Sequence, residues 1–212
     1  EVFIDAAFAF AVTMLVISFD NIPSTYDEII LAIKSIPAFV VAVAQLVWIW
    51  HTHNVWSRRF GLDTAYTVFV STVLLIVVLI YVYPMRIMAG GMFAWFTGDF
   101  LPSNFILTGL DQLRDMFVFL GFGFVALSLV FVEMYRYATR LSSELLLNER
   151  ERFESRTLAL MWGGAAVIGT VCVVLAVTLP TPLVPYSGFA FSLLGAWFPL
   201  VRWRRHKSMP GG

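Results

Sequence analysis

Charged residues are scarce in this chain, and their scarcity excludes most soluble protein classes. Of 212 residues only 13% are charged, whereas 59% are hydrophobic. A soluble domain carries charge at about 25% of its positions. Acidic and basic residues balance at 14 each, so there is no net charge to attract nucleic acid. The composition predicts an integral membrane protein and leaves no room for a catalytic globular domain.

Side chains that bind metals or cofactors are also few. The one cysteine, Cys172, lies in an apolar run, which argues against a disulfide or a thiolate metal site. His51 and His53 lie about 200° apart around a helix, so they cannot hold one metal from the same face. The third histidine, His206, is in the basic tail, and no Ser–His–Asp, paired-carboxylate or Gly-rich phosphate pattern is present. We therefore expect no enzyme, no metal and no cofactor.

Long apolar runs make up most of the sequence. At about 20 residues per membrane-spanning helix, the chain accommodates about six spans. The whole of residues 1–207 is predicted to form one all-α, polytopic transmembrane domain, followed by a short tail at 208–212. The predicted spans are approximately 2–19, 36–53, 64–83, 116–135, 157–179 and 184–201.

Proline, glycine and charge set the expected boundaries of these spans. Because proline fits the first turn of a helix, Pro37 predicts the start of the second span, with 24–35 as a short half-buried turn before it. Pro84 predicts the end of the third span. Residues 85–114, which glycines interrupt, are expected to make an interfacial excursion. The charged segment 136–156 has leucines at helical spacing and is expected to extend the fourth helix into water.

The basic residues predict how the chain is oriented in the cell membrane. Eleven of them fall in loops on one side or in the C-terminal tail, and three fall on the other side. By the positive-inside rule the first side is cytoplasmic, and both termini lie there. The eleven are Arg58, Arg59, Arg136, Arg140, Arg150, Arg152, Arg156, Arg202, Arg204, Arg205 and Lys207, and the three are Lys34, Arg86 and Arg114.

The first predicted span distributes its side chains unevenly around the helix. At about 100° per residue, Thr13 flanks a narrow stripe of large apolar residues, and Asp5 points roughly the opposite way. Ordinary contact with lipid or another helix would explain the stripe. A hydrophobic constriction that gates a pore by dewetting would also explain it, if symmetry copies of this helix surround an axis. The stripe consists of Phe3, Phe10, Met14 and Ile17.

The carboxylate of Asp5 is costly within a membrane and needs a protein partner or water. The candidate partners are His51, His53 and an aromatic N–H on the second or third span, all predicted near the same side of the membrane. Structural hydrogen bonding is one interpretation of Asp5. A direct part in ion or proton permeation is the other.

Two motifs resemble the transmembrane protein 175 family of potassium channels. The run from Phe3 to Val16, FIDAAFAFAVTMLV, is similar to the first helix of that family, whose hallmark is Phe-Ser-Asp, then a small and apolar run and a Thr. Trp50, His53 and Asn54 are similar to the family's Trp-x-x-His in the second span. Six spans with both termini inside also match, and the resemblance covers essentially the whole chain.

The resemblance implies a homotetrameric, potassium-preferring cation channel in the membrane lipid, whose first helices line a central pore. K⁺ would be the permeant ion. The constriction would be formed by Phe10, Met14 and Ile17, with Thr13 as a polar ring beside it. Support of the first helix, rather than contact with ions, would fall to Phe3, Asp5, Trp50 and His53.

Two residues depart from the pattern of the family. Ile4 stands in place of the motif serine and removes one hydrogen-bonding group. Phe10 stands where the family usually has Ile or Leu, which would make the narrowest ring wider in girth and flatter. The family lacks the carbonyl-lined filter sequence of ordinary potassium channels, and so does this chain.

Two other functions fit the residues alone. A small secondary transporter would use Asp5 and Glu133 as proton or substrate ligands, although the chain shows no clear inverted repeat or pair of Gly/Pro-broken spans. A non-conducting membrane scaffold would use the first-helix stripe only for assembly.

Overall fold

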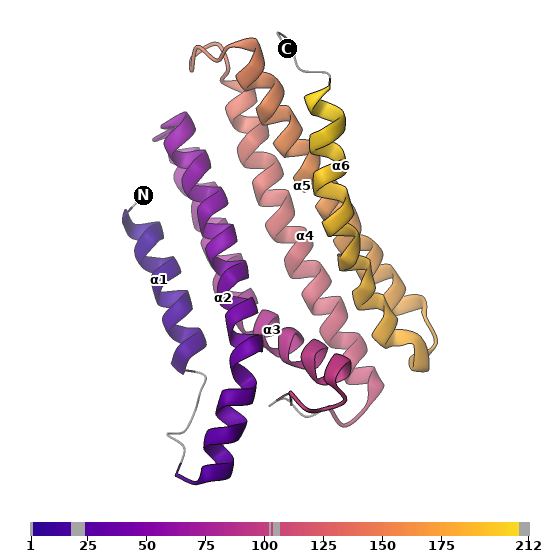
Figure 1. Cartoon of the computed structure of the whole chain (residues 1–212). Coiled ribbons are helices and arrows are strands. Elements are labelled where there is room, and N and C mark those ends of the chain that lie inside the picture. Colours follow the sequence, from indigo (N-terminus) through magenta and orange to yellow (C-terminus); the bar gives the residue numbers. More distant parts are fainter. Residues whose placement is uncertain (1, 18–23, 102, 104–106, 208–212) are drawn as a thin grey trace. The chain divides into compact units, whose positions relative to one another are not determined.

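The fold is α-helical, as predicted. The structure, a computed structural model, describes residues 2–17, 24–101, 103 and 107–207, without the side chains of 16 and 17, and these residues contain no strand. Figure 1 labels the α-helices along the chain. They are α1 (Val2–Ile17), α2 (Tyr26–Phe60), α3 (Ala65–Thr97), α4 (Leu110–Arg140), α5 (Glu149–Thr178) and α6 (Leu193–His206), with a 3₁₀ helix, η1 (Thr181–Ser192), before α6.

Five helical segments in the described residues are long and apolar enough to cross a membrane. They are α2, α3, α4, α5 and the continuous pair η1–α6. The remaining α-helix, α1, is apolar, and 16 residues of it are described, with residues 18–23 outside the described part. At 1.5 Å per residue these 16 residues rise about 24 Å, less than the hydrocarbon core of about 30 Å. The chain is thus a multi-pass membrane protein, and six complete spans remain a prediction.

The chain divides into two compact units. The first consists of Glu1–Val55 and Leu75–Thr108, and the second of Trp56–Leu74 and Gly109–Gly212. The first unit therefore holds α1, most of α2 and the later part of α3. The second holds α4, α5, η1 and α6, together with the adjoining ends of α2 and α3.

Helix α2 begins at Tyr26, so the start predicted at Pro37 is wrong. The physical reason is a capping box: the Glu28 N–H donates to Thr25 Oγ1, 3.3 Å away, and the Thr25 N–H donates to the Glu28 carboxylate. The backbone N–H of Ser24, 2.7 Å from Glu28 Oε2, and its hydroxyl, 2.9 Å away, hold the pKa of this carboxyl below its usual value. Residues 26–35 thus belong to the helix, and Pro37 lies inside it.

We expected the third span to end at Pro84, but helix α3 continues past this residue to Thr97. Apolar packing outweighs the proline here, because Met85, Ala89 and Ala94 are buried beyond it. The helix ends at Gly98, which takes a left-handed φ of 58°, and the Asp99 N–H donates to Ala94 O at 2.9 Å. This is the Schellman arrangement that favours glycine after a helix.

Segment 136–156 extends the fourth helix only as far as Arg140, and the expected continuation to residue 156 is wrong. Helix α4 ends at Arg140, and a turn follows in which Leu146 has a φ of 50°. A second capping box then starts α5: Asn148 Oδ1 accepts from the Glu151 N–H at 2.8 Å, and the Glu151 carboxylate accepts from the Asn148 N–H at 2.9 Å. The two hydrogen bonds of this capping box start a new helix at Glu149, and they outweigh the leucine spacing that predicted a continuous one.

The last span is mixed, where one α-helix over 184–201 was expected. Its first part is the 3₁₀ helix η1, which follows Pro180, has Pro182 in its first turn and contains Pro185. Because proline has no backbone N–H, these positions cannot donate the i→i−4 bonds of an α-helix. The buried residues of η1 are Val184, Ser187 and Ala190, which follow the 3.0-residue turn of a 3₁₀ helix.

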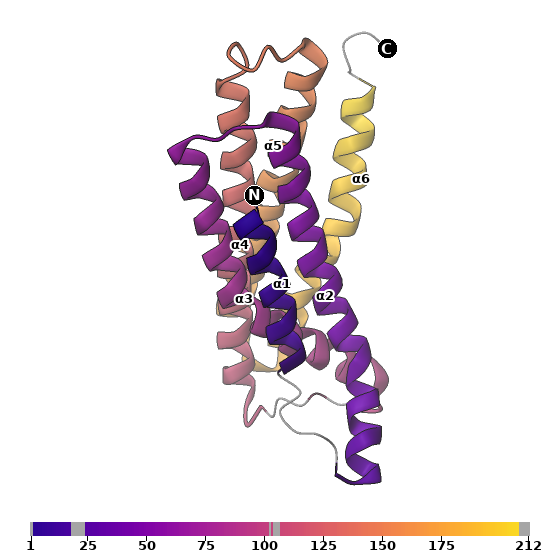
Figure 2. The ribbon, with the colours of Figure 1, turned by 90° about the vertical axis from the view of Figure 1, so that its left-hand side faces the viewer.

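Small residues bring α4 and α5 close together in the second unit (Figure 1 and Figure 2). A Cβ atom on Gly121 would lie 2.4 Å from Val173 Cγ2 and 3.2 Å from Gly169 O, so only glycine fits this crossing. Deeper in the same interface the rings of Phe131 and Trp162 stack with centroids 4.4 Å apart. The α4–α5 pair is therefore a rigid core for the second unit.

Candidate functional site

Helix α1 packs through one face and leaves the other uncovered. The buried face consists of Phe8, Ala11 and Leu15, which are 4%, 0% and 0% exposed. Their spacing of three and four residues places them on one side of a helix. Figures 1 and 2 show α1 running alongside α2 within the first unit. The packing fixes the rotation of α1 about its own axis, and hence which side chains point away.

The indole of Trp50 ties the first half of α1 to α2. Trp50 Nε1 donates to Asp5 Oδ1 at 2.8 Å, and both side chains are partly buried. Of the partners expected for Asp5, the structure thus places an aromatic N–H against its carboxylate. The bond satisfies the carboxylate within the protein, which removes the penalty of an unpartnered acid among apolar helices.

Arg86 of α3 holds the other end of α1. Its Nη1 donates to Leu15 O at 3.1 Å, near the end of the helix. The last four carbonyls of a helix have no intrahelical donor and carry partial negative charge, so an arginine stabilises them doubly. We did not anticipate this contact. The only sequence signal was an isolated arginine shortly after Pro84.

The uncovered face of α1 carries part of the predicted constriction. Phe10 is 56% exposed, and Thr13 is exposed on the same side. The Thr13 hydroxyl donates to Ala9 O at 3.0 Å. Its proton is therefore used within the helix, and the lone pairs of Oγ1 face outward as acceptors.

The other predicted site residues are placed less uniformly. Met14 is half-buried at the edge of the uncovered face. The side chain of Ile17 lies outside the described residues. Phe3 is 75% exposed and does not pack inside a single chain, whereas His53 is 3% exposed in the same unit as Trp50. The structure thus brings Asp5 and Trp50 together and separates Phe3 from them.

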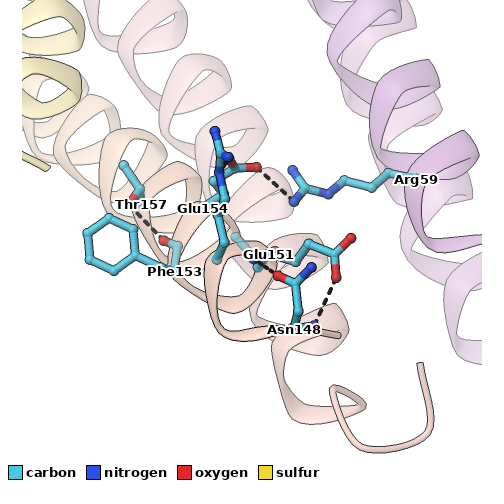
Figure 3. A network of polar contacts seen from close by, with 8 residues as sticks. Arg59, Asn148, Glu151, Phe153, Glu154 and Thr157 are labelled. Atoms are coloured by element: carbon cyan, nitrogen blue, oxygen red, sulfur yellow. Dashed lines mark hydrogen bonds and ion pairs between the residues drawn. The ribbon is translucent and has the colours of Figure 1, made fainter. Parts of the chain in front are cut away.

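A second polar cluster lies in the other unit, around the start of α5 (Figure 3). Arg59, near the end of α2, donates to Glu154 at 2.9 Å, and Arg150 lies 3.4 Å from the same carboxylate. These groups are only partly buried, so the ion pairs contribute little to stability individually. Their chemistry is that of a solvated helix end rather than of a ligand site.

The titratable side chains do not form a metal centre in the described part of the chain. No group of three or more His, Cys, Asp or Glu side chains comes together there. Glu133, considered above as a transport ligand, accepts from the Tyr66 hydroxyl at 3.0 Å and pairs with Arg140 at 3.1 Å. Its carboxylate therefore has local partners in the second unit.

The fold and the apolar helices define the class as polytopic α-helical membrane protein, and comparisons with known proteins narrow it. Over 164 residues, 74% of the chain, the sequence is 34% identical to a protein of Marivirga tractuosa named potassium channel. The chain spans 65% of the length of that relative. No family model matches the chain.

A solved structure resembles the whole chain. It is the crystal structure of a threonine-to-alanine variant of the potassium channel MtTMEM175, in complex with a nanobody–MBP fusion protein. The TM-score is 0.82 and the sequences are 27% identical, with 98% of this chain and 92% of that chain covered. The chain thus resembles the transmembrane protein 175 family in its structure as well as in its motifs. Both relatives are named as channels, which are not enzymes.

Proposed function

We propose that the chain is a potassium-preferring cation channel in which four copies of α1 surround a central pore. The observation that carries the proposal is the asymmetry of α1. Asp5 and Leu15 O are tied to α2 and α3 on one side, and the face with Phe10 and Thr13 is left uncovered. The names of the two relatives support a potassium channel. The termini would lie in the cytoplasm, as the basic residues predict.

In such a pore, rings of Phe10, Met14 and Ile17 act as the constriction. Apolar rings that are narrow enough expel water and stop ions without a physical plug, so opening requires the rings to widen or to wet. The phenyl groups of Phe10 are large and flat, and a small rotation of α1 changes the free radius. The seating of α1 on α2 and α3 therefore controls conduction.

Thr13 would contribute cation preference beside these rings. Because its proton is donated to Ala9 O, the hydroxyl oxygen presents lone pairs and no donor to the pore. That arrangement attracts a partly dehydrated cation and gives nothing to an anion. Thr13→Val keeps the shape and removes the oxygen, so it should lower the K⁺/Na⁺ preference, and Thr13→Ser should keep it.

The test is cation flux into liposomes that contain the purified chain. Phe10→Ala should raise K⁺ flux and reduce selectivity, because the narrowest ring is removed. Phe119→Ala is the matched control, since Phe119 is 50% exposed on α4 and belongs to the other unit. It should leave flux unchanged.

Four outcomes would contradict the proposal. The wild-type chain could carry no cation current, or Phe10→Ala could match the control. Saturable, pH-coupled uptake without single-channel events would indicate the transporter instead. An effect of Phe10→Ala on assembly alone, with no flux in any variant, would indicate a scaffold.

A further inference from the structure

The last turns of α6 present a one-sided surface that the channel proposal does not use. Pro199, Arg202, Trp203, His206 and Lys207 line one open hollow of about 440 Å³. Their spacing of three, one, three and one places all five on a single face of the helix. Among the described residues, the lining of the hollow therefore comes from one helix face.

The opposite face of α6 is used for packing. Val201 is 6% exposed. Arg205 Nε donates to Thr157 Oγ1 at 3.2 Å, and its guanidinium lies 4.4 Å from the centroid of the Phe153 ring. These contacts fix the rotation of α6 against α5. The face with Arg202 and Lys207 therefore points away from the second unit's core.

The hollow combines an apolar floor with a cationic rim. Trp203 is 57% exposed, and the Lys207 ammonium lies 3.9 Å from the centroid of its ring. Pro199 continues the apolar surface toward the start of α6, and Arg202 adds a second cationic group to the lining. Residues 181–207 contain no Asp or Glu, so this segment supplies no acid to pair with Arg202. A ligand for this surface needs negative charge next to hydrocarbon.

Two of the three acids of the neighbouring helix have partners other than the basic residues of α6. Glu151 is engaged by the Asn148 N–H in the capping box. Glu154 is held by Arg59 and Arg150, as Figure 3 shows for the first of them. Against the single remaining acid, Glu149, the basic residues at the end of α6 are in excess.

The position of the hollow along α6 matches the edge of a bilayer. The helix is apolar up to Val201 and basic from Arg202 onward. Tryptophan prefers the level of the lipid headgroups, and Lys and Arg reach toward the phosphates from apolar stems. Clusters of basic residues directly beyond a membrane span bind anionic lipids.

We propose that this face of α6, here called the α6 basic face (Pro199, Arg202, Trp203, His206 and Lys207), binds the headgroup of an anionic phospholipid. Arg202 and Lys207 contact the phosphodiester, and the glycerol and upper acyl chain lie on Pro199 and Trp203. The proposal does not depend on whether the chain conducts.

The test uses the purified full chain in detergent and native mass spectrometry. Phosphatidylglycerol and phosphatidylcholine with the same acyl chains are added separately, and bound lipids are counted. The wild-type chain should retain more phosphatidylglycerol than phosphatidylcholine. At about 1 kcal/mol per basic residue, Arg202→Gln/Lys207→Gln should weaken that binding about 25-fold. Binding of phosphatidylcholine should not change.

Two further variants make the result specific. Arg58→Gln/Arg136→Gln removes the same charge from exposed positions on other helices, and should keep the preference. Arg202→Lys/Lys207→Arg keeps the charge and should also keep the preference for phosphatidylglycerol. This variant therefore separates loss of charge from loss of fold.

Three results would overturn the proposal. The first is an unchanged preference in Arg202→Gln/Lys207→Gln. The second is an equal loss of preference in the control variant. The third is a change in the number of chains per assembly with lipid preference retained, which would make this face a subunit contact.

Discussion

The hydrogen bond between Trp50 and Asp5 gives the sharpest prediction about how α1 is seated. Trp50→Phe removes the indole N–H, keeps an aromatic ring, and leaves Asp5 Oδ1 without the donor that lies 2.8 Å away. A hydrogen bond to a carboxylate contributes about 1.5–3 kcal/mol. Since both groups are only partly buried, we expect about 2 kcal/mol. For a chain of this size that lowers the melting temperature by about 4–8 °C.

A double-mutant cycle isolates the bond from lost ring packing. The variants are Trp50→Phe, Asp5→Ala and the two combined, with thermal unfolding of the purified chain in detergent as the assay. The two single changes should each destabilise, and the combined variant should be little worse than either. If the two effects add to within about 0.5 kcal/mol, the pair is uncoupled and the bond does not seat α1.

Three further predictions concern helix ends and crossings. Arg86→Met removes the donor to Leu15 O and should lower the melting temperature by about 3–6 °C, with partial recovery in Arg86→Lys; no shift would show that this end of α1 is held otherwise. Gly121→Ala should destabilise by about 1–3 kcal/mol through overpacking, whereas Gly163→Ala, with nothing within 4 Å, should not; equal effects in denaturant unfolding would refute the close crossing. The lowered pKa of Glu28 means that its cap stabilises α2 above the unfolded-state pKa and is lost as the pH falls through the folded pKa; a carboxyl NMR titration at the usual glutamate value would contradict this.

The sequence predicted the fold class well because it depends on composition, which is read directly. It failed at helix ends. Capping-box signals were present in the sequence as Thr25 with Glu28 and Asn148 with Glu151. The prediction rested instead on Pro37 for the second helix and on leucine spacing for residues 136–156. Pro84 was the opposite case, because burial of apolar residues beyond it outweighed one missing backbone bond.

The candidate site was predictable only in part. A lone acid on an apolar helix needs a partner, so Asp5 pointed to a donor on the second or third span. His51, His53 and the aromatic N–H groups of the second and third spans could not be ranked, because the choice depends on the rotation of α1. Arg86 could not be found at all, since its acceptor is a main-chain carbonyl that no residue type marks.

The 3₁₀ helix at the start of the last span has a consequence for how this segment can vary among relatives. Its buried residues, Val184, Ser187 and Ala190, lie in one straight row because each turn takes three residues. Removing three residues would shorten the segment by about 6 Å and keep the row intact. Removing four, which an α-helix tolerates better, would turn everything beyond by about 120°. Length differences in this part of the family should therefore come in multiples of three.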